Sequence, residues 1–285
     1  AATLKQISDG GPDAFYKGDI ARKVGEASAA NGGLITAKDF ADYTVTETAP
    51  LYCSYRGYRV ISTPPPSSGG ASMCEILNIL GGYPMDKMPG HSAQSVHLMV
   101  EAMRHAYVDR NFELGDPDFW KNPLDRLLSQ QHAANIRKVI DPVKATPSAQ
   151  VKIGTVPHES EQTTHYSVVD KAGNAVSVTY TLNGGYGAQV IAGDTGFLLN
   201  NEMDDFTSKV GAPNMYGLVQ GVSNSIQPGK RPLSSMAPTI VTKDGKLFMV
   251  TGSPGGSRII TIVLESILNV IDQKMDMKAA VNTPR

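Results

Sequence analysis

The stretch Thr163-Thr164-His165-Tyr166-Ser167-Val168-Val169-Asp170 decides how this sequence is interpreted. It has the alternation of a strand, and it follows a polar, irregular segment, 142–162, that is typical of an exposed linker. A pair of threonines at a strand entry is by itself ordinary structure, because β-branched residues favour strands. A threonine becomes a nucleophile when its own α-amino group serves as the base, which requires a cut after Gln162. The junction of linker and strand is a place where such a cut could occur.

The residues after this stretch predict more strands and a closing helix. Segments 166–169 and 175–181 flank a turn and form one expected hairpin, and segments 239–241 and 247–250 form a second. A helix is expected from 257 to about 273, since its apolar residues recur on one face.

The first half of the chain has mostly helical periodicity. Gly11-Pro12-Asp13 predicts a helix start, and the spacing of Val96, Val100, Met103 and Tyr107 predicts a helix over 91–111. Further helices are expected around 73–80 and 125–139, and a short hairpin over 44–52 and 58–62. The two halves together predict a mixed α/β fold.

Composition excludes several classes of protein. The 285 residues carry 26 basic and 27 acidic side chains, so no excess charge attracts a nucleic acid or an anionic membrane. No apolar run approaches the roughly 20 residues that cross a bilayer. The two cysteines, Cys53 and Cys74, could form at most one disulfide, and no Cys/His cluster has metal-ligand spacing. We therefore expect no metal, no cofactor, no nucleic-acid partner and no membrane span in this chain.

A glycine-rich turn, Thr251-Gly252-Ser253-Pro254-Gly255-Gly256-Ser257, follows a predicted strand and begins a predicted helix. The free N–H groups of such a helix start suit a phosphate, a carboxylate or a developing oxyanion equally well. The turn lacks the GxGxxG pattern and the Lys-Ser/Thr pair of a phosphate loop. A plain structural turn and a nucleotide-binding module are the alternatives to an oxyanion site.

Two polar segments complete the candidate site. In the loop 200–206, Glu202 and Asp205 stand beside amide side chains and could hold an ammonium group, although a solvated acidic turn is the simpler interpretation. Ser234 and Ser235 offer two adjacent hydroxyls, which as a bare dipeptide carry little information. Together the two segments could bind both ends of an α-amino acid.

These motifs, in this order and approximate spacing, resemble the γ-glutamyltranspeptidases. The matching segments after the linker are 163–170, 181–183, 198–206, 231–236 and 252–258, and those before it include 13–16, 31–36, 55–58 and 64–70. The resemblance implies a precursor of the N-terminal-nucleophile hydrolase class with a four-layer α/β/β/α sandwich. It also implies that the chain is an internal section in which that sandwich is incomplete, with family segments missing at both ends.

The resemblance implies a role for each candidate residue. Thr163 attacks the carbonyl of Gln162 during self-cleavage and is afterwards nucleophile and base, and Thr181 supports it. Gly255 and Gly256 supply the oxyanion N–H groups. Asn183, Glu202 and Asp205 bind the substrate α-amino group. Ser234 and Ser235 bind its α-carboxylate. Residues 210–221, which include Tyr216, form a lid over the site.

The expected enzyme is a γ-glutamyltransferase, also called a glutathione hydrolase, which transfers γ-glutamyl groups from donors such as glutathione to an amino acid, a peptide or water. Residues 1–162 would belong to the large-subunit segment and 163–285 to the small-subunit segment of one interleaved domain, joined as a heterodimer. The family implies a zymogen with a periplasmic or extracellular location. The alternatives are a glutaryl or cephalosporin acylase of the same superfamily, which Asp205 disfavours because a glutaryl group has no ammonium to pair with it, and a noncatalytic fragment or pseudoenzyme.

Overall fold

The computed structural model describes residues 1–151, 162–214 and 217–284, and the chain divides into two compact units. Unit 1 comprises Ala1–Thr48 and Leu182–Asn201. Unit 2 comprises Ala49–Thr181 and Glu202–Arg285. Each unit is therefore built from two segments of the chain. Most of the predicted site residues lie in unit 2.

Unit 1 contains three helices, α1 (Ala2–Tyr16), α2 (Asp19–Ala30) and α3 (Ala37–Asp42). The predicted helix start at Gly11-Pro12 is confirmed, because α1 joins two helical segments across a kink at Gly11, with φ +62°, and the second segment starts at Pro12. The first segment, from Ala2, was not predicted. Proline is tolerated there because the helix is already interrupted. The ring of Phe15 packs 5.6 Å from both Phe40 and Phe197, which ties the helices to the returning segment of the same unit.

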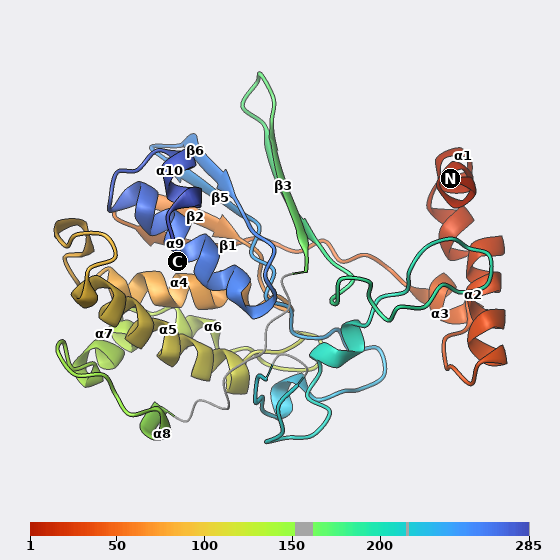
Figure 1. The fold of residues 1–285 in the computed structure, drawn as a ribbon, viewed down its shortest axis with the longest axis horizontal. Coiled ribbons are helices and arrows are strands. Elements are labelled where there is room, and N and C mark those ends of the chain that lie inside the picture. Colours follow the sequence, from red (N-terminus) through yellow and green to blue (C-terminus); the bar gives the residue numbers. More distant parts are fainter. Residues whose placement is uncertain (152–161, 215–216, 285) are drawn as a thin grey trace. The chain divides into compact units, whose positions relative to one another are not determined.

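Unit 2 contains a four-stranded antiparallel sheet in the order β1-β2-β5-β6 (Figure 1). Its strands are β1 (Leu51–Tyr55), β2 (Tyr58–Ser62), β5 (Thr239–Lys243) and β6 (Lys246–Thr251). The predicted strand over 44–52 is wrong in its first part, since residues 44–50 are exposed and pair with no strand of the described structure. The two central strands, β2 and β5, come from opposite sides of residue 162 in sequence.

The helices of unit 2 build its core around α4 (Gly69–Leu80), in which all twelve residues are buried. This helix contacts β1 and β2 and also α5, α7 and α9. Most of its residues are small or apolar, and such a helix needs neighbours all around it, so its sequence explains this central position. The other helices are α5 (Ala93–Glu113), α6 (Leu124–Leu127), α7 (Gln130–Val139), α8 (Ser148–Val151), α9 (Ile259–Ile271) and α10 (Met277–Asn282).

Helix α5 confirms the predicted helix but buries an unexpected face. Val96 and Val100, which carried the apolar spacing, are 38% and 45% exposed. Apart from Leu98, the buried residues are small or polar instead: Ser95, Glu101, Ala102, Ala106 and Arg110. Small side chains allow α5 to approach α4 closely, and the polar ones form specific contacts that are described below.

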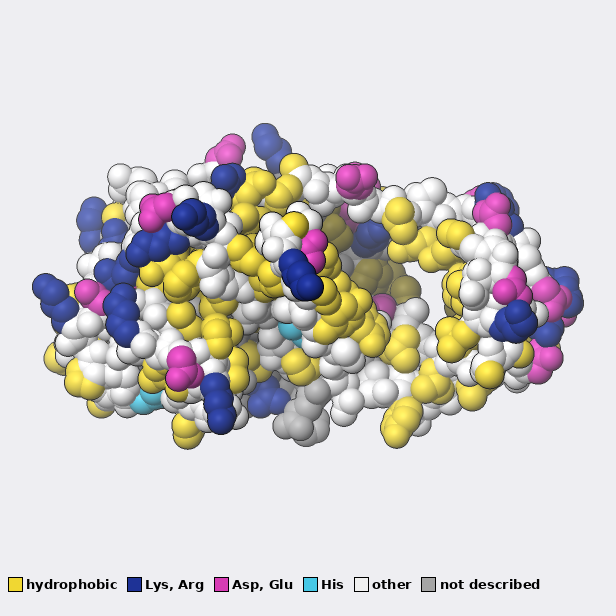
Figure 2. Space-filling model, turned by 90° about the horizontal axis from the view of Figure 1, so that it is seen from above, with side chains coloured by type: hydrophobic (Ala, Val, Ile, Leu, Met, Phe, Trp, Pro, Cys, Tyr) yellow, Lys and Arg dark blue, Asp and Glu magenta, His cyan; other side chains and the backbone are white. Residues whose placement is uncertain are grey.

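The hairpin β3 (Thr164–Val169) and β4 (Ala175–Tyr180) forms a separate two-stranded sheet that contacts β5 and β6. The predicted hairpin is confirmed, and its register places Thr164 opposite Tyr180 and Val169 opposite Ala175. Apolar side chains gather on the face of the molecule seen from above (Figure 2), and five of the hairpin's large hydrophobic residues are about half exposed: Tyr166, Val168, Val169, Val176 and Tyr180.

Cys53 of β1 and Cys74 of α4 form a disulfide between the sheet and the central helix. Among the described residues, no helix is both long enough and apolar enough to span a membrane.

Candidate active site

Thr163 and Thr181 lie side by side at the open end of the hairpin. Thr163 immediately precedes β3 and Thr181 immediately follows β4, so they continue the strand register by one pair. Their Oγ1 atoms are 3.4 Å apart. The Thr163 hydroxyl also forms a hydrogen bond with the carbonyl oxygen of Gln162. The hydroxyl therefore lies next to the carbonyl group that self-cleavage would require it to attack.

The glycine-rich turn follows β6 and leads into a helix, as its sequence predicted. Gly255 and Gly256 have φ +130° and +55°, conformations that side chains with a Cβ rarely adopt. Gly256 begins a short 3-10 turn, Gly256–Arg258, which continues directly into α9. The first N–H groups of a helix have no partner within it, and the positive end of the helix dipole lies there too. This turn can therefore hold a negative charge.

His165 of β3 connects the hairpin to the glycine-rich turn. Its ring lies so close to Gly252 that a Cβ atom there would be 2.1 Å from the ring. Its two nitrogens contact the hydroxyls of Thr179, at 2.8 Å, and Ser167, at 3.1 Å. Burial lowers the pKa of His165, which favours a neutral ring at this position.

Ser177 makes a second connection between the hairpin and the four-stranded sheet. Its hydroxyl donates to the carbonyl of Thr251 at 3.0 Å and accepts from the backbone N–H of Thr239 at 3.1 Å. The middle of the hairpin is therefore fixed to the end of the four-stranded sheet that carries the glycine-rich turn.

Glu202 and Asp205 lie on one 3-10 turn, Glu202–Asp205, in unit 2. Burial and the charge of Asp205 raise the pKa of Glu202 to about 8. The Asn224 side chain donates to the backbone carbonyl of Asp205 at 2.7 Å and fixes the turn. Two carboxyl groups that hinder each other's ionisation form a site whose energy falls when a cation binds.

Ser234 and Ser235 are held by the proline-rich segment before α4. The backbone N–H of Ser234 donates to Pro66 at 2.9 Å, and its carbonyl accepts from the N–H of Ser68 at 2.8 Å. The Ser234 hydroxyl oxygen accepts from the N–H of Met236 at 3.1 Å. Gly69 is required in this segment, because a Cβ there would lie 2.4 Å from the carbonyl oxygen of Met236.

Arg110 is a residue of this region that the sequence did not reveal. Its side chain is fully buried on α5 and donates to Ser235 Oγ at 2.7 Å and to Ser68 Oγ at 2.8 Å. A lone arginine in an amphipathic helix normally belongs to the solvated face. The signal that could have found it is its spacing of four from Ala106 and eight from Ala102 on a face of small residues.

Two predicted residues are not among those described above for unit 2. Asn183 lies in unit 1, is buried, has φ +72°, and donates to the carbonyl of Asn201 at 3.1 Å. Tyr216 of the predicted lid lies outside the described residues.

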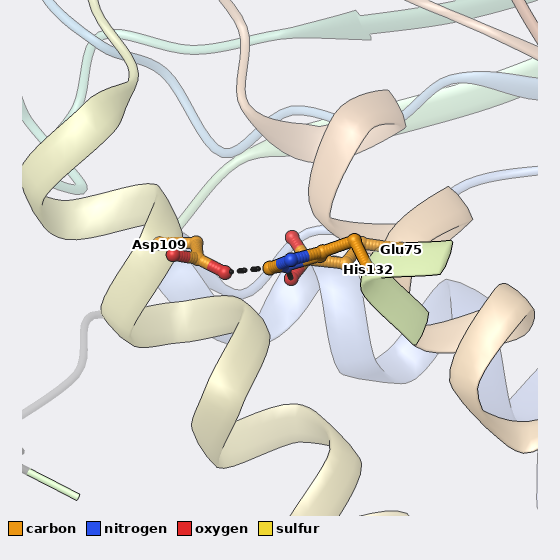
Figure 3. Close-up of side chains that lie close together, drawn as sticks. All are labelled: Glu75, Asp109 and His132. Atoms are coloured by element: carbon orange, nitrogen blue, oxygen red, sulfur yellow. Dashed lines mark hydrogen bonds and ion pairs between the residues drawn. The ribbon is translucent and has the colours of Figure 1, made fainter. Parts of the chain in front are cut away.

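A separate cluster has the residue types of a metal site. Glu75 of α4, Asp109 of α5 and His132 of α7 point toward one another (Figure 3). His132 Nε2 is 2.9 Å from Asp109 Oδ2 and 3.2 Å from Glu75 Oε1, and its Nδ1 is 3.4 Å from Nη1 of Arg126. Hydrogen bonds account for this geometry, since Nε2–H can donate to the oxygens of Asp109 and Glu75 while Nδ1 accepts from the guanidinium in the neutral tautomer. The cluster joins three core helices.

Comparison with known proteins matches the whole chain to one family. The family model described as gamma-glutamyltranspeptidase matches residues 1–285. A glutathione hydrolase proenzyme of Pseudomonas sp. (strain A14) is 62% identical over 285 residues, which are 100% of this chain and 50% of that protein. An acylase ACY 1 proenzyme of Pseudomonas sp. (strain SE83) is 40% identical over 100% of this chain and 49% of its own length. The chain thus spans about half the length of these curated relatives.

Among solved structures, a cephalosporin acylase from Bacillus halodurans superimposes with a TM-score of 0.83 at 26% identity, covering 100% of this chain and 49% of that one. The predicted fold class, the α/β fold of the N-terminal-nucleophile hydrolases, is thereby confirmed.

Proposed function

The chain belongs to the γ-glutamyltranspeptidase family, and from this we propose that it carries the centre of a self-cleaving γ-glutamyl amide hydrolase and transferase. The observation that carries the proposal is the placement of the Thr163 hydroxyl, against the carbonyl oxygen of Gln162 and 3.4 Å from Thr181 Oγ1. One side chain at one strand entry could thus serve both maturation and turnover.

In maturation, Thr163 Oγ1 attacks the Gln162 carbonyl carbon and the peptide bond to the Thr163 nitrogen breaks, which leaves an ester. Water then hydrolyses this ester and frees both the Gln162 carboxylate and the Thr163 amine. Thr181 would orient the attacking hydroxyl. The process requires no metal or cofactor, in keeping with the expected chemistry.

In turnover, the free amine of Thr163 takes the hydroxyl proton while Oγ1 attacks the γ-carbonyl of the donor. The N–H groups of Gly255 and Gly256 would stabilise the resulting oxyanion, and the loss of one such donor typically costs about 3 kcal/mol. The amine of the donor leaves with a proton, and water or an acceptor amine then cleaves the γ-glutamyl ester. The proposed donors are glutathione and related γ-glutamyl compounds.

Substrate binding is assigned by charge. Glu202 and Asp205 would pair with the α-ammonium group, which relieves the repulsion that raises the pKa of Glu202. Ser234 and Ser235 would donate to the α-carboxylate. The roles of Asn183 in ammonium binding and of the 210–221 lid with Tyr216 remain proposals from the family pattern.

The test is an intact-mass measurement on the full-length protein that contains this sequence. Two pieces are expected, the smaller beginning at Thr163. Thr163→Ala should give one uncut, inactive chain, whereas the matched control Thr163→Ser should still cut slowly because it keeps the hydroxyl. A single uncut wild-type chain with full activity would contradict the proposal, and an uncut, inactive one would favour a noncatalytic protein.

A glutaryl or cephalosporin acylase is the second candidate, because an acylase proenzyme is 40% identical to the chain and a cephalosporin acylase shares its fold. The carboxyl pair argues for the first candidate, since a glutaryl group brings no ammonium to it. Faster cleavage of a glutaryl anilide than of a γ-glutamyl anilide would favour the acylase over the γ-glutamyl hydrolase. Asp205→Asn should reduce the preference in cleavage rate for the γ-glutamyl anilide over the glutaryl anilide.

For location and partners, we propose a periplasmic or extracellular heterodimer of the two pieces, 1–162 and 163–285 being parts of the large and small subunits. The Cys53–Cys74 disulfide supports an oxidising compartment. Non-reducing mass spectrometry of protein from fractionated cells tests both statements.

A further inference from the structure

We propose that Arg110 is a positioning residue that makes the serine pair specific for an anionic α-carboxylate. The inference rests on the proposed function and extends it to a residue on α5. Arg110 is 2% exposed, and its guanidinium donates both to Ser235 and to Ser68, the residue before α4.

The first step of the argument is the direction of the hydrogen bonds. Arg110 Nη2 donates to Ser235 Oγ at 2.7 Å. A guanidinium has only donors, whereas a serine hydroxyl has one hydrogen and two lone pairs. Ser235 therefore uses a lone pair toward Arg110, and its hydrogen is directed to another acceptor. A carboxylate, which only accepts, is the complementary ligand.

Ser234 has the same polarity. Its hydroxyl oxygen accepts from the backbone N–H of Met236 at 3.1 Å, so its hydrogen too is available to donate. Arg110 supports this residue indirectly, because its Nε donates to Ser68 Oγ at 2.8 Å and Ser68 Oγ donates to the carbonyl of Ser234 at 2.6 Å. One guanidinium thus orients the side chain of one serine and the backbone of the other.

The second step is charge. Arginine stays protonated at all accessible pH values. A carboxylate bound by Ser235 would lie one hydroxyl group away from this buried cation, where attraction is stronger than in water. A neutral group of the same size would gain nothing from the charge. Arg110 Nη1 also donates to Asn111 Oδ1 at 2.9 Å, which further fixes the orientation of the planar guanidinium group.

The test compares two anilides on the full-length protein that contains this sequence: a γ-glutamyl anilide and a 4-aminobutyryl anilide, which lacks only the α-carboxylate. Arg110→Gln should lower kcat/KM for the γ-glutamyl anilide at least about tenfold, mainly through KM, and change the 4-aminobutyryl anilide by no more than about twofold. Arg110→Lys keeps the charge but not the planar guanidinium with its several donors. Its kcat/KM for the γ-glutamyl anilide should lie between those of wild type and Arg110→Gln.

Two further variants keep the test decisive. Arg104→Gln removes another arginine of α5, one that binds Glu101 and Thr146, and should leave the ratio of the two substrates unchanged. The double variant Ser235→Ala with Arg110→Gln should lose less transition-state stabilisation for the γ-glutamyl anilide than the two single variants lose in sum. The reason is that both residues act through one hydrogen bond. If Arg110→Gln does not fold, Arg110→Lys and Ser68→Ala provide the same comparison.

Equal losses on both anilides in the folded Arg110 variants, or no loss, would overturn the inference and leave the proposed function standing. A wild-type protein that cleaves neither anilide would instead refute the proposed function.

Discussion

The hydroxyls of Thr163 and Thr181 face each other at 3.4 Å across the open end of one hairpin. The only covalent path between them runs through both strands, so the strand register sets their separation. A change in this register by one residue would move Thr181 to the opposite face of the hairpin.

Thr181→Val should slow self-cleavage about tenfold or more, which corresponds to about 1.4 kcal/mol, because valine keeps the shape and loses the hydroxyl. The time course of precursor disappearance on gels measures this. Thr181→Ser is the control and should process at nearly the wild-type rate. Equal rates for wild type and Thr181→Val would remove Thr181 from the mechanism.

Gly255→Ala should lose about 1–3 kcal/mol of stability because of its positive φ, and should also lose most of kcat. The matched control is Gly57→Ala in the β1–β2 turn, where φ is +81° and a Cβ would meet nothing within 4 Å. It should lose comparable stability in urea unfolding but keep kcat. Full activity of folded Gly255→Ala would contradict the oxyanion role of this turn.

Stability should fall as pH rises through the range in which Glu75 titrates. Burial raises the pKa of Glu75 to about 8, so the folded protein keeps this proton at pH values where the unfolded chain has lost it. Its contribution is complete below the ordinary value of 4.5 and is lost as pH rises through about 8. The slope is up to about 1.4 kcal/mol per pH unit.

Glu75→Gln should therefore flatten the dependence of unfolding free energy on pH in this range. The hydrogen bond with Glu75 raises the pKa of His132, so protonation of His132 also makes stability fall as pH rises above 6.5. Glu75→Gln should weaken this contribution of His132 as well. Urea titrations at a series of pH values measure both effects, with exposed Glu26→Gln as the control. Parallel curves for wild type and Glu75→Gln would show that Glu75 does not hold a proton in the folded state.

Removal of the disulfide should destabilise the protein by about 3 kcal/mol, since Cys53 and Cys74 are 21 residues apart. The variant that combines Cys53→Ser with Cys74→Ala should unfold at lower urea concentration and should not respond to a reductant. Wild type should lose the same stability when reduced. A reductant-insensitive wild type would mean that the bond contributes nothing.

Regular periodicity made part of the fold predictable. The alternation in β3 and β4 and the apolar face of α9 gave the correct elements, because side-chain burial follows the period of the backbone. The strand expected from residue 44 failed because β-branched residues form a strand only where a neighbour is available to pair.

The candidate site was predictable only in part, for a related reason. Thr163, Gly255 and Ser235 lie in loops or at strand ends, where short motifs keep their local pattern. The partner of Ser235 is 125 residues away on α5, and nothing in a single sequence encodes that contact. The division of the chain at residue 162 and the roles of the site residues stay predictions.

The central pair of the four-stranded sheet, β2 and β5, gives the proposed cut an unusual thermodynamic consequence. After the cut, β2 would belong to the large fragment and β5 to the small fragment. Breaking this strand pairing would then separate two molecules instead of unfolding one. Melting of the cut protein would then be a second-order equilibrium, and its midpoint would fall on dilution, while that of the uncut Thr163→Ala chain would not. Maturation would thus exchange a concentration-independent stability for one set by mass action.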